Sequence, residues 1–138
     1  MDGFGLNPSP HHNAVFEANT PNLDRYFSSY PMTGLEASGR AIGLPMGQMG
    51  NSEVGHMTIG SGSVVKQDLV RIDDSISDQS FYRNSALVSA IEAAKRKNRP
   101  IHLMGLVSDG GVHSHVNHLL SLIDLCAAHE VVPQVHMI

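Results

Sequence analysis

Glycine recurs at short intervals between residues 34 and 62, and this spacing limits what that part of the chain forms. The glycines lie at positions 34, 39, 43, 47, 50, 55, 60 and 62. Because glycine weakens helices and strands from within, only short elements fit here, and we expect most of the segment to be structured loop. A long loop inside a compact domain is usually functional, so this segment is the first place to look for a site.

Capping residues and prolines predict helices on both sides of this segment. Thr20-Pro21 reads as an N-cap followed by a proline at the first helical position, and Pro31 ends that helix. Further on, Asn84 or Ser85 caps a helix whose apolar residues, at 87, 90, 91 and 94, share one face and which ends in the basic turn 95–97.

The last third of the chain alternates strand and helix patterns. We expect a buried strand over 101–107, a turn over 108–111 and a second strand over 131–138, in which Pro133 suits either the strand start or an edge strand. Between them, a helix from about 114 to 130 carries inward-facing apolar residues, namely Leu119, Leu120, Ile123 and Cys126. This alternation predicts a parallel sheet covered by helices. Ligands in such sheets bind at the carboxyl ends of the strands, here the segment 108–115.

Composition argues against several classes of function. Lysine plus arginine is 9 against 13 aspartate plus glutamate, a net charge of −4, which disfavours binding to nucleic acid or to an anionic membrane surface. Cys126 is the single cysteine, so no internal disulfide forms and a reducing compartment is favoured. The sequence shows neither a signal-peptide pattern nor an apolar run long enough to span a bilayer. We therefore expect a soluble, cytoplasmic protein.

A serine in the glycine-rich segment is the first candidate for chemistry. Ser52 follows the turn Gly50-Asn51 where a short helix is expected to start. Free N–H groups and the helix dipole at that point suit an anion, but a serine needs a base or a metal ion to act as a nucleophile. From spacing alone, the plainer interpretation is that Asn51 or Ser52 only caps the helix.

Two other segments carry candidate ligands. Asp2 precedes a glycine turn, where it is either an Asx-turn residue or a hard oxygen ligand for a divalent cation. His113, His115 and His118 follow the predicted strand, and the last two are spaced to share a helix face as a metal pair. Surface or capping roles explain these histidines equally well. The histidines at 11, 12, 102, 129 and 136 show no partner pattern.

Four stretches, in this order, cover almost the whole chain and match one family. They read DGFGLNP, ANTPNLDRYFSSYP, ASGRAIGLPMGQMGNSEVGHMTIGSGSVVKQDLVRI and HLMGLVSDGGVHSHVNHL. The segments GQMGNSEVGH and LMGLVSDGGVHSH within them are long and highly specific. With these motifs the chain closely resembles the cofactor-independent (2,3-bisphosphoglycerate-independent) phosphoglycerate mutases.

The resemblance implies a fold and an activity. The fold is α/β, with the N-terminal part of an alkaline-phosphatase-like metal-binding domain in residues 1–66 and the start of an inserted α/β phosphotransferase domain, which binds substrate, in residues 67–138. The activity is that of an isomerase that interconverts 3-phosphoglycerate and 2-phosphoglycerate in glycolysis and gluconeogenesis. The implied partner is this small-molecule substrate, with no nucleic acid and no membrane, and the full-length protein is expected to be a monomer.

The resemblance also implies site residues and cofactors. By motif, Ser52 corresponds to the serine that takes the phosphoryl group as a phosphoserine intermediate and also contacts a metal ion. Asp2 corresponds to a ligand of the same ion, and His113 corresponds to a substrate-binding histidine of the inserted domain. The implied cofactors are two divalent ions, most simply Mn²⁺, with no 2,3-bisphosphoglycerate.

Family members are longer than this chain. The resemblance implies an apolar strand before Asp2 and further metal and substrate ligands beyond Ile138, and Asp2 and Ser52 alone do not hold two ions. We therefore expect the 138 residues by themselves to be inactive and to expose core surface. Two alternatives stay open: a non-catalytic fragment that acts as a binding module, and another metal-dependent phosphatase or phosphomutase of the same superfamily.

Overall fold

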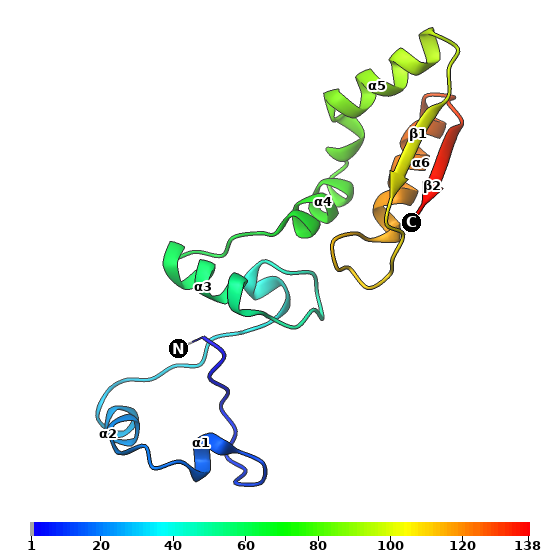
Figure 1. Cartoon of the computed structure of the whole chain (residues 1–138). Helices are drawn as coiled ribbons and strands as arrows, with labels where there is room; N and C mark the ends of the chain where they lie inside the picture. The colour runs from blue at the N-terminus through cyan, green and yellow to red at the C-terminus, as the bar shows by residue number, and fades with distance from the viewer. Residues whose placement is uncertain (1) are drawn as a thin grey trace.

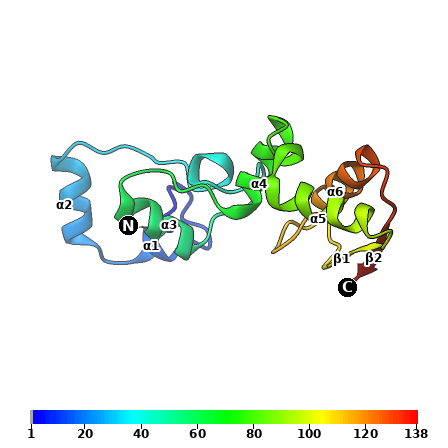
Figure 2. The same cartoon turned by 90° about the horizontal axis from the view of Figure 1, so that it is seen from above.

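The computed structural model describes residues 2–138 and shows an elongated chain of helices with one small sheet near the C-terminus (Figures 1 and 2). The α-helices are α1 (Ala14–Glu17), α2 (Pro21–Ser29), α3 (Ser52–Ser61), α4 (Asp68–Ser77), α5 (Ser85–Arg96) and α6 (Val116–Ala128). The 3-10 helices are η1 (Gly39–Ile42) and η2 (Phe81–Arg83), and the strands are β1 (Ile101–Gly105) and β2 (Pro133–Met137). The architecture is therefore mixed α/β.

The N-terminal helices α1 and α2 form a separate end of the molecule (Figure 1). Within the described residues, neither helix buries a side chain. The predicted bounds of α2 are confirmed, with Thr20 at the N-cap, Pro21 at the first helical position and Pro31 just beyond the end. The Thr20 hydroxyl does not cap the backbone; it donates to Asp24 Oδ1 at 2.9 Å instead.

The glycine-rich segment is largely loop, as expected, but it contains a longer helix than its glycines suggest. Helix α3 has 10 residues and ends at Gly62, which adopts the left-handed conformation with φ of 65°. Beneath it lies a small apolar cluster of Ile42, Leu44 and Val54. This cluster joins η1 to α3 and fixes the loop between them.

The C-terminal part has the predicted helix–strand order. Strands β1 and β2 pair in parallel, with Ile101 opposite Pro133 and Gly105 opposite Met137, and α6 connects them. Asn84 caps α5 by accepting hydrogen bonds from the backbone N–H groups of residues 86 and 87. A core of Ile91, Leu125, Cys126 and Val131 lies between α5, α6 and the turn into β2.

Two predictions about burial are wrong. The strand over 101–107 was expected to be buried, but its side chains are half-buried or exposed, and Met104 is 73% exposed. Leu120 was expected to face inward and is 50% exposed, while Ser121 of the same helix is buried. The physical reason is that a strand is buried only by what covers it, and here the sheet has two strands whose faces are mostly open. Large apolar side chains are exposed on β2 as well, among them Met137 at 73%.

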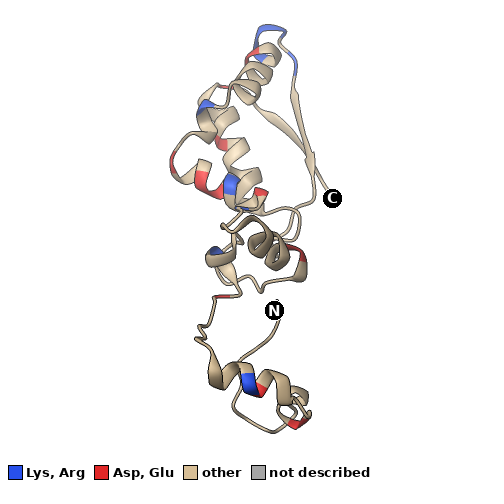
Figure 3. Ribbon diagram, turned by 90° about the vertical axis from the view of Figure 1, so that its left-hand side faces the viewer, with Lys and Arg blue, Asp and Glu red and all other residues tan. Residues whose placement is uncertain are grey.

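An ion-pair cluster ties the two halves of the described chain together. Asp74 of α4 accepts from Arg40 of η1 and from Lys66 in the connecting segment, the latter at 2.7 Å. These two cations, Lys66 first, hold the pKa of the Asp74 carboxyl below its ordinary value. Along α4, Arg71 lies between acidic residues, whereas the charged residues of α5 are gathered near its C-terminal end (Figure 3).

The two apolar clusters lie on either side of the expected boundary between residues 66 and 67. The division into domains 1–66 and 67–138 and the alkaline-phosphatase-like core stay predictions. Among residues 2–138, no helix combines the length and the apolar character needed to cross a membrane.

Candidate functional site

The loop before α3 is held by its own backbone. Gly39 N–H donates to the Gln48 carbonyl at 2.9 Å, and Ser38 and Met49 form an antiparallel bridge. Gly50 packs so closely on the Ala37 carbonyl that any side chain there would overlap it. The loop therefore holds Asn51 and Ser52 in a defined conformation at the start of α3.

Asn51 is the N-cap of α3, as one of the two interpretations of this motif proposed. Its side-chain oxygen accepts from Val54 N–H at 3.0 Å. Ser52 is the first residue of the helix, and its hydroxyl is not used for capping. The Ser52 hydroxyl is instead 3.1 Å from His56 Nδ1, one turn along the helix.

The N-terminal segment returns to α3 and brings Asp2 to this turn. Asp2 Oδ2 lies 3.3 Å from His56 Nδ1, so Asp2 and Ser52 contact the same imidazole nitrogen. Asp2 also packs against Gly55, where an added Cβ would overlap the carboxylate. The structure thus groups two of the predicted site residues, although they are far apart in the sequence.

The oxygen atoms of this cluster suit a hard divalent cation. A carboxylate and a hydroxyl are ligands that Mn²⁺ and Mg²⁺ accept. Among residues 2–138, no group of three or more histidine, cysteine, aspartate or glutamate side chains is arranged to hold a metal ion. Asp2 and Ser52 therefore fit part of the coordination sphere of one ion, and no ligand set for a second ion is present in this part of the chain.

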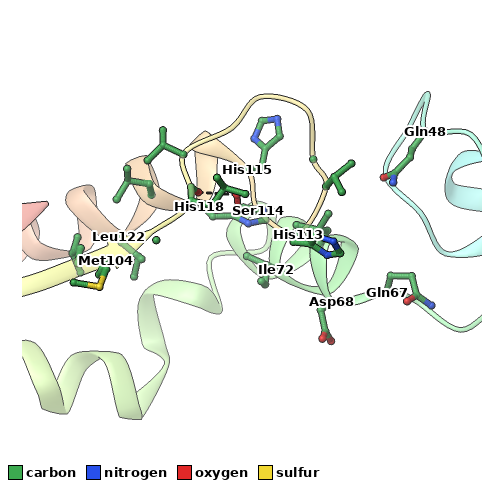
Figure 4. A pocket seen from close by; sticks show the side chains of 18 of the residues that line it. Gln48, Gln67, Asp68, Ile72, Met104, His113, Ser114, His115, His118 and Leu122 are labelled. Atoms are coloured by element: carbon green, nitrogen blue, oxygen red, sulfur yellow. Dashed lines mark hydrogen bonds between the residues drawn. The ribbon is translucent and has the colours of Figure 1, made fainter. Parts of the chain in front are cut away.

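A cleft with a volume of about 890 Å³ opens beside this turn. One wall comes from the loop and first turn of α3, including Gln48, Asn51 and Glu53, and the other from the segment between β1 and α6. Figure 4 shows Gln48 across the opening from His113, with Gln67 and Asp68 below them. Ser52 does not line the cleft, but both of its sequence neighbours do.

The β1–α6 segment holds His113 in an uncommon backbone conformation. Its φ is 70°, in the left-handed region that residues other than glycine seldom adopt. The segment is fixed by Ser114 Oγ, which donates to the Leu106 carbonyl at 2.7 Å, and by Val116 N–H, which donates to the Ser108 carbonyl at 2.8 Å. His113 is therefore placed on the cleft wall, at the carboxyl end of β1 where a ligand was expected.

The other two histidines of this segment have structural partners. His115 is the N-cap of α6, and its Nδ1 accepts from Asn117 N–H at 3.2 Å. His118 Nε2 lies 2.7 Å from Asp73 Oδ1 on α4, with only 14% of the His118 side chain exposed. The capping interpretation is correct for His115. The metal-pair interpretation of His115 and His118 gains no support, because among residues 2–138 no third histidine, cysteine, aspartate or glutamate joins them in a group arranged to hold a metal ion.

Sequence reasoning missed two contacts. His102 and His136 were expected to have no partner, but His102 Nδ1 is 2.9 Å from His136 Nε2 across the two strands, with the rings stacked. His56 was not singled out, although its spacing of four residues from Ser52 places both on one helix face. That spacing was the available signal, whereas the contact with Asp2 depends on tertiary structure.

Known proteins are similar to this chain over most of its length. The family model described as the N-terminus of BPG-independent PGAM matches residues 72–138. Residues 72–138, close to half of the chain, are thus similar to the BPG-independent phosphoglycerate mutases, and the relatives described next carry the same name.

Curated relatives extend the match toward the N-terminus. The chain is 54% identical over 125 residues to the 2,3-bisphosphoglycerate-independent phosphoglycerate mutase of Clostridium perfringens, which covers 91% of this chain and 24% of that protein. The enzymes of the same name from Moorella thermoacetica and Coxiella burnetii are 56% and 57% identical over the same length and coverage. The chain thus spans about a quarter of the length of these relatives.

Proposed function

We propose that this chain supplies the phosphoryl-accepting serine and the cleft of a phosphoglycerate mutase that interconverts 3-phosphoglycerate and 2-phosphoglycerate. The observation that carries the proposal is the meeting of Asp2 and Ser52 at His56, beside a cleft whose far wall holds His113. The relatives bear the name of this activity. Cytoplasmic location and a monomeric full-length protein stay predictions.

The proposed reaction passes through Ser52. Ser52 Oγ attacks the phosphorus of 3-phosphoglycerate, the bond from phosphorus to the substrate oxygen breaks, and the serine proton ends on the freed 3-hydroxyl. The 2-hydroxyl of the same glycerate then attacks phosphoserine, and its proton returns to Ser52. The scheme needs no phosphorylated cofactor, because the phosphoryl group moves from the substrate to Ser52 and then back to the same glycerate.

Each residue has a distinct task in this scheme. Asp2 and Ser52 would hold a divalent cation, most simply Mn²⁺, which favours the alkoxide and offsets its repulsion from the phosphate. His113 would bind the substrate across the cleft, and a bound glycerate is thereby kept close while it reorients. The Asn51 cap and the Gly50 contact keep the serine fixed at the head of α3.

The test is a chimera in which this chain replaces the 125 matching residues of the Clostridium perfringens relative. Ser52→Ala in the chimera should lower mutase kcat about a thousandfold or more and abolish the labelling of the protein by ³²P-phosphoglycerate in Mn²⁺. Ser61→Ala, at the other end of α3, is the matched control and should leave both unchanged. Full activity of the Ser52→Ala chimera would show that another group accepts the phosphoryl.

A further inference from the structure

His56 contacts both proposed metal ligands through a single atom. Its Nδ1 lies 2.8 Å from the Ser52 carbonyl oxygen, 3.1 Å from Ser52 Oγ and 3.3 Å from Asp2 Oδ2. Three oxygens from two distant parts of the chain therefore surround one ring nitrogen. The His56 side chain is otherwise largely exposed, at 69%, so these polar contacts rather than burial define its place.

The identity of these oxygens decides where the imidazole proton is. A carbonyl oxygen and a carboxylate are acceptors only, whereas a serine hydroxyl both donates and accepts. If Nδ1 carried no hydrogen, its lone pair would face the Ser52 carbonyl oxygen and the Asp2 carboxylate, which repel it. The carbonyl oxygen is the nearest of the three oxygens, so this repulsion would be strong. The arrangement is favourable when Nδ1 carries hydrogen, and the neutral ring then has its lone pair on Nε2.

A histidine beside a nucleophilic serine acts either as a general base or as a hydrogen-bond donor that positions the serine. The place of the proton distinguishes these two roles. A general base must present a lone pair to the hydroxyl. Nδ1–H presents a donor, so at this atom His56 does not take the serine proton. The one hydrogen on Nδ1 is shared: the Ser52 carbonyl is its nearest acceptor, and Ser52 Oγ and Asp2 Oδ2 both lie within reach of it, which keeps the hydroxyl and the carboxylate side by side.

We propose that His56 is a positioning residue: its Nδ1–H holds Ser52 Oγ beside the Asp2 carboxylate and so pre-forms the cation-binding pair. The inference rests on the proposed function for the meaning of that pair, but the hydrogen-bond assignment stands on the geometry alone. The helix makes the device rigid, because Asn51 caps the turn and Val54, only 4% exposed, anchors it to the small apolar cluster.

The first test reads the tautomer directly in the 138-residue chain. Long-range ¹H–¹⁵N correlation at a pH where the neutral imidazole dominates should show His56 with a protonated Nδ1 and an unprotonated Nε2. Its signals are identified by their loss in His56→Ala. A neutral His56 with hydrogen on Nε2 would overturn the proposal, whatever the activity of the chimera.

The second test uses the chimera and the different reach of two amide side chains. The amide nitrogen of asparagine sits near the position of Nδ1, whereas that of glutamine sits near Nε2. His56→Asn should keep Mn²⁺ affinity, measured by calorimetry, within about threefold, while His56→Gln and His56→Ala should each weaken it about tenfold or more, the range seen when outer partners of metal ligands are removed.

These outcomes separate the two proposals. Equal Mn²⁺ affinity in all three His56 variants would overturn the role of Nδ1–H. So would a result in which His56→Gln keeps Mn²⁺ affinity and His56→Asn loses it. If the unsubstituted chimera neither turns over nor binds Mn²⁺, the proposed function fails, and the tautomer measurement still decides the hydrogen bond. Circular dichroism of each variant confirms that α3 is kept, so that a folding defect is not read as lost positioning.

Discussion

The carboxylate of Asp2 occupies the space that a side chain on Gly55 would fill. Since Gly55 lies within α3, where glycine carries an intrinsic cost, its presence is explained by this close approach and not by helix stability. The absence of a side chain at position 55 is what lets the N-terminal segment bring Asp2 within reach of Ser52 and His56.

Replacing Gly55 should therefore separate helix stability from metal binding. Gly55→Ala favours the helix by up to about 1 kcal/mol but displaces Asp2, so Mn²⁺ affinity in the chimera should fall at least about tenfold. Gly60→Ala is the matched control, because it lies in the same helix with nothing within 4 Å of its added Cβ. Calorimetric titration checks both; equal affinity in the two variants would contradict the packing of Asp2 on Gly55.

The backbone conformation of His113 and its imidazole ring should have separate effects, the first on stability and the second on substrate binding. Asparagine tolerates the left-handed region, so His113→Asn should change the free energy of unfolding by less than about 0.5 kcal/mol. Loss of the imidazole should raise KM for phosphoglycerate in the chimera about tenfold, the equivalent of one charge-assisted hydrogen bond. Ser52 should keep part of its phosphatase-like reactivity. His12→Asn, also left-handed with φ of 54°, should leave KM unchanged; an unchanged KM in His113→Asn as well would count against substrate binding by His113.

The contact between His118 and Asp73 should stabilise the packing of α6 on α4. A double-mutant cycle with His118→Ala and Asp73→Asn should give a coupling energy of about 1 kcal/mol, because the histidine is largely buried. The exposed Arg71–Asp68 pair, at 3.1 Å, is the comparison and should give less than about 0.5 kcal/mol. Urea unfolding of the 138-residue chain measures both couplings, and equal values would argue that the burial of His118 does not strengthen its contact with Asp73.

Asp74 should make stability depend on pH in a defined direction. Because Lys66 and Arg40 lower the pKa of Asp74 in the folded state, its contribution is fully present above the ordinary aspartate pKa of about 4 and is lost as pH falls through the lower folded-state value. The difference in unfolding free energy between the unsubstituted chain and Asp74→Asn should be constant above about pH 5 and shrink below about pH 4. Asp68→Asn controls for general acid effects; a difference that grows on acidification would have the wrong sign.

Local signals were sufficient for α2 and α5 but did not reveal α1 or α4, and they suggested a shorter α3. Thr20-Pro21 and Asn84 mark helix starts through backbone preferences that act within a few residues, and the structure places α2 and α5 where these residues predict. The parallel pairing of β1 and β2 followed from the helix between them. The helix starts depend on contacts that are close in sequence, and the strand pairing follows from a general rule of chain connection.

Burial and long-range contacts were beyond such signals. The apolar run at 101–107 predicts a strand, but its exposure depends on what covers the sheet. The His102–His136 contact appears only once two strands are in register. At the site, Ser52 and Asp2 were chosen individually, whereas their common contact with His56 depends on how the N-terminal segment crosses α3. The contributions of His56 and Gly55 are therefore tertiary information.

The two-stranded sheet has a consequence for the behaviour of this chain in concentrated solution. Two paired strands leave unpaired backbone groups along their outer edges, and a bare strand edge is a template for another strand. Apolar side chains flank these edges, among them Val132 at 85% and Met137 at 73% exposure. We therefore expect the isolated chain to precipitate as its concentration rises, because strands of different molecules pair along these edges.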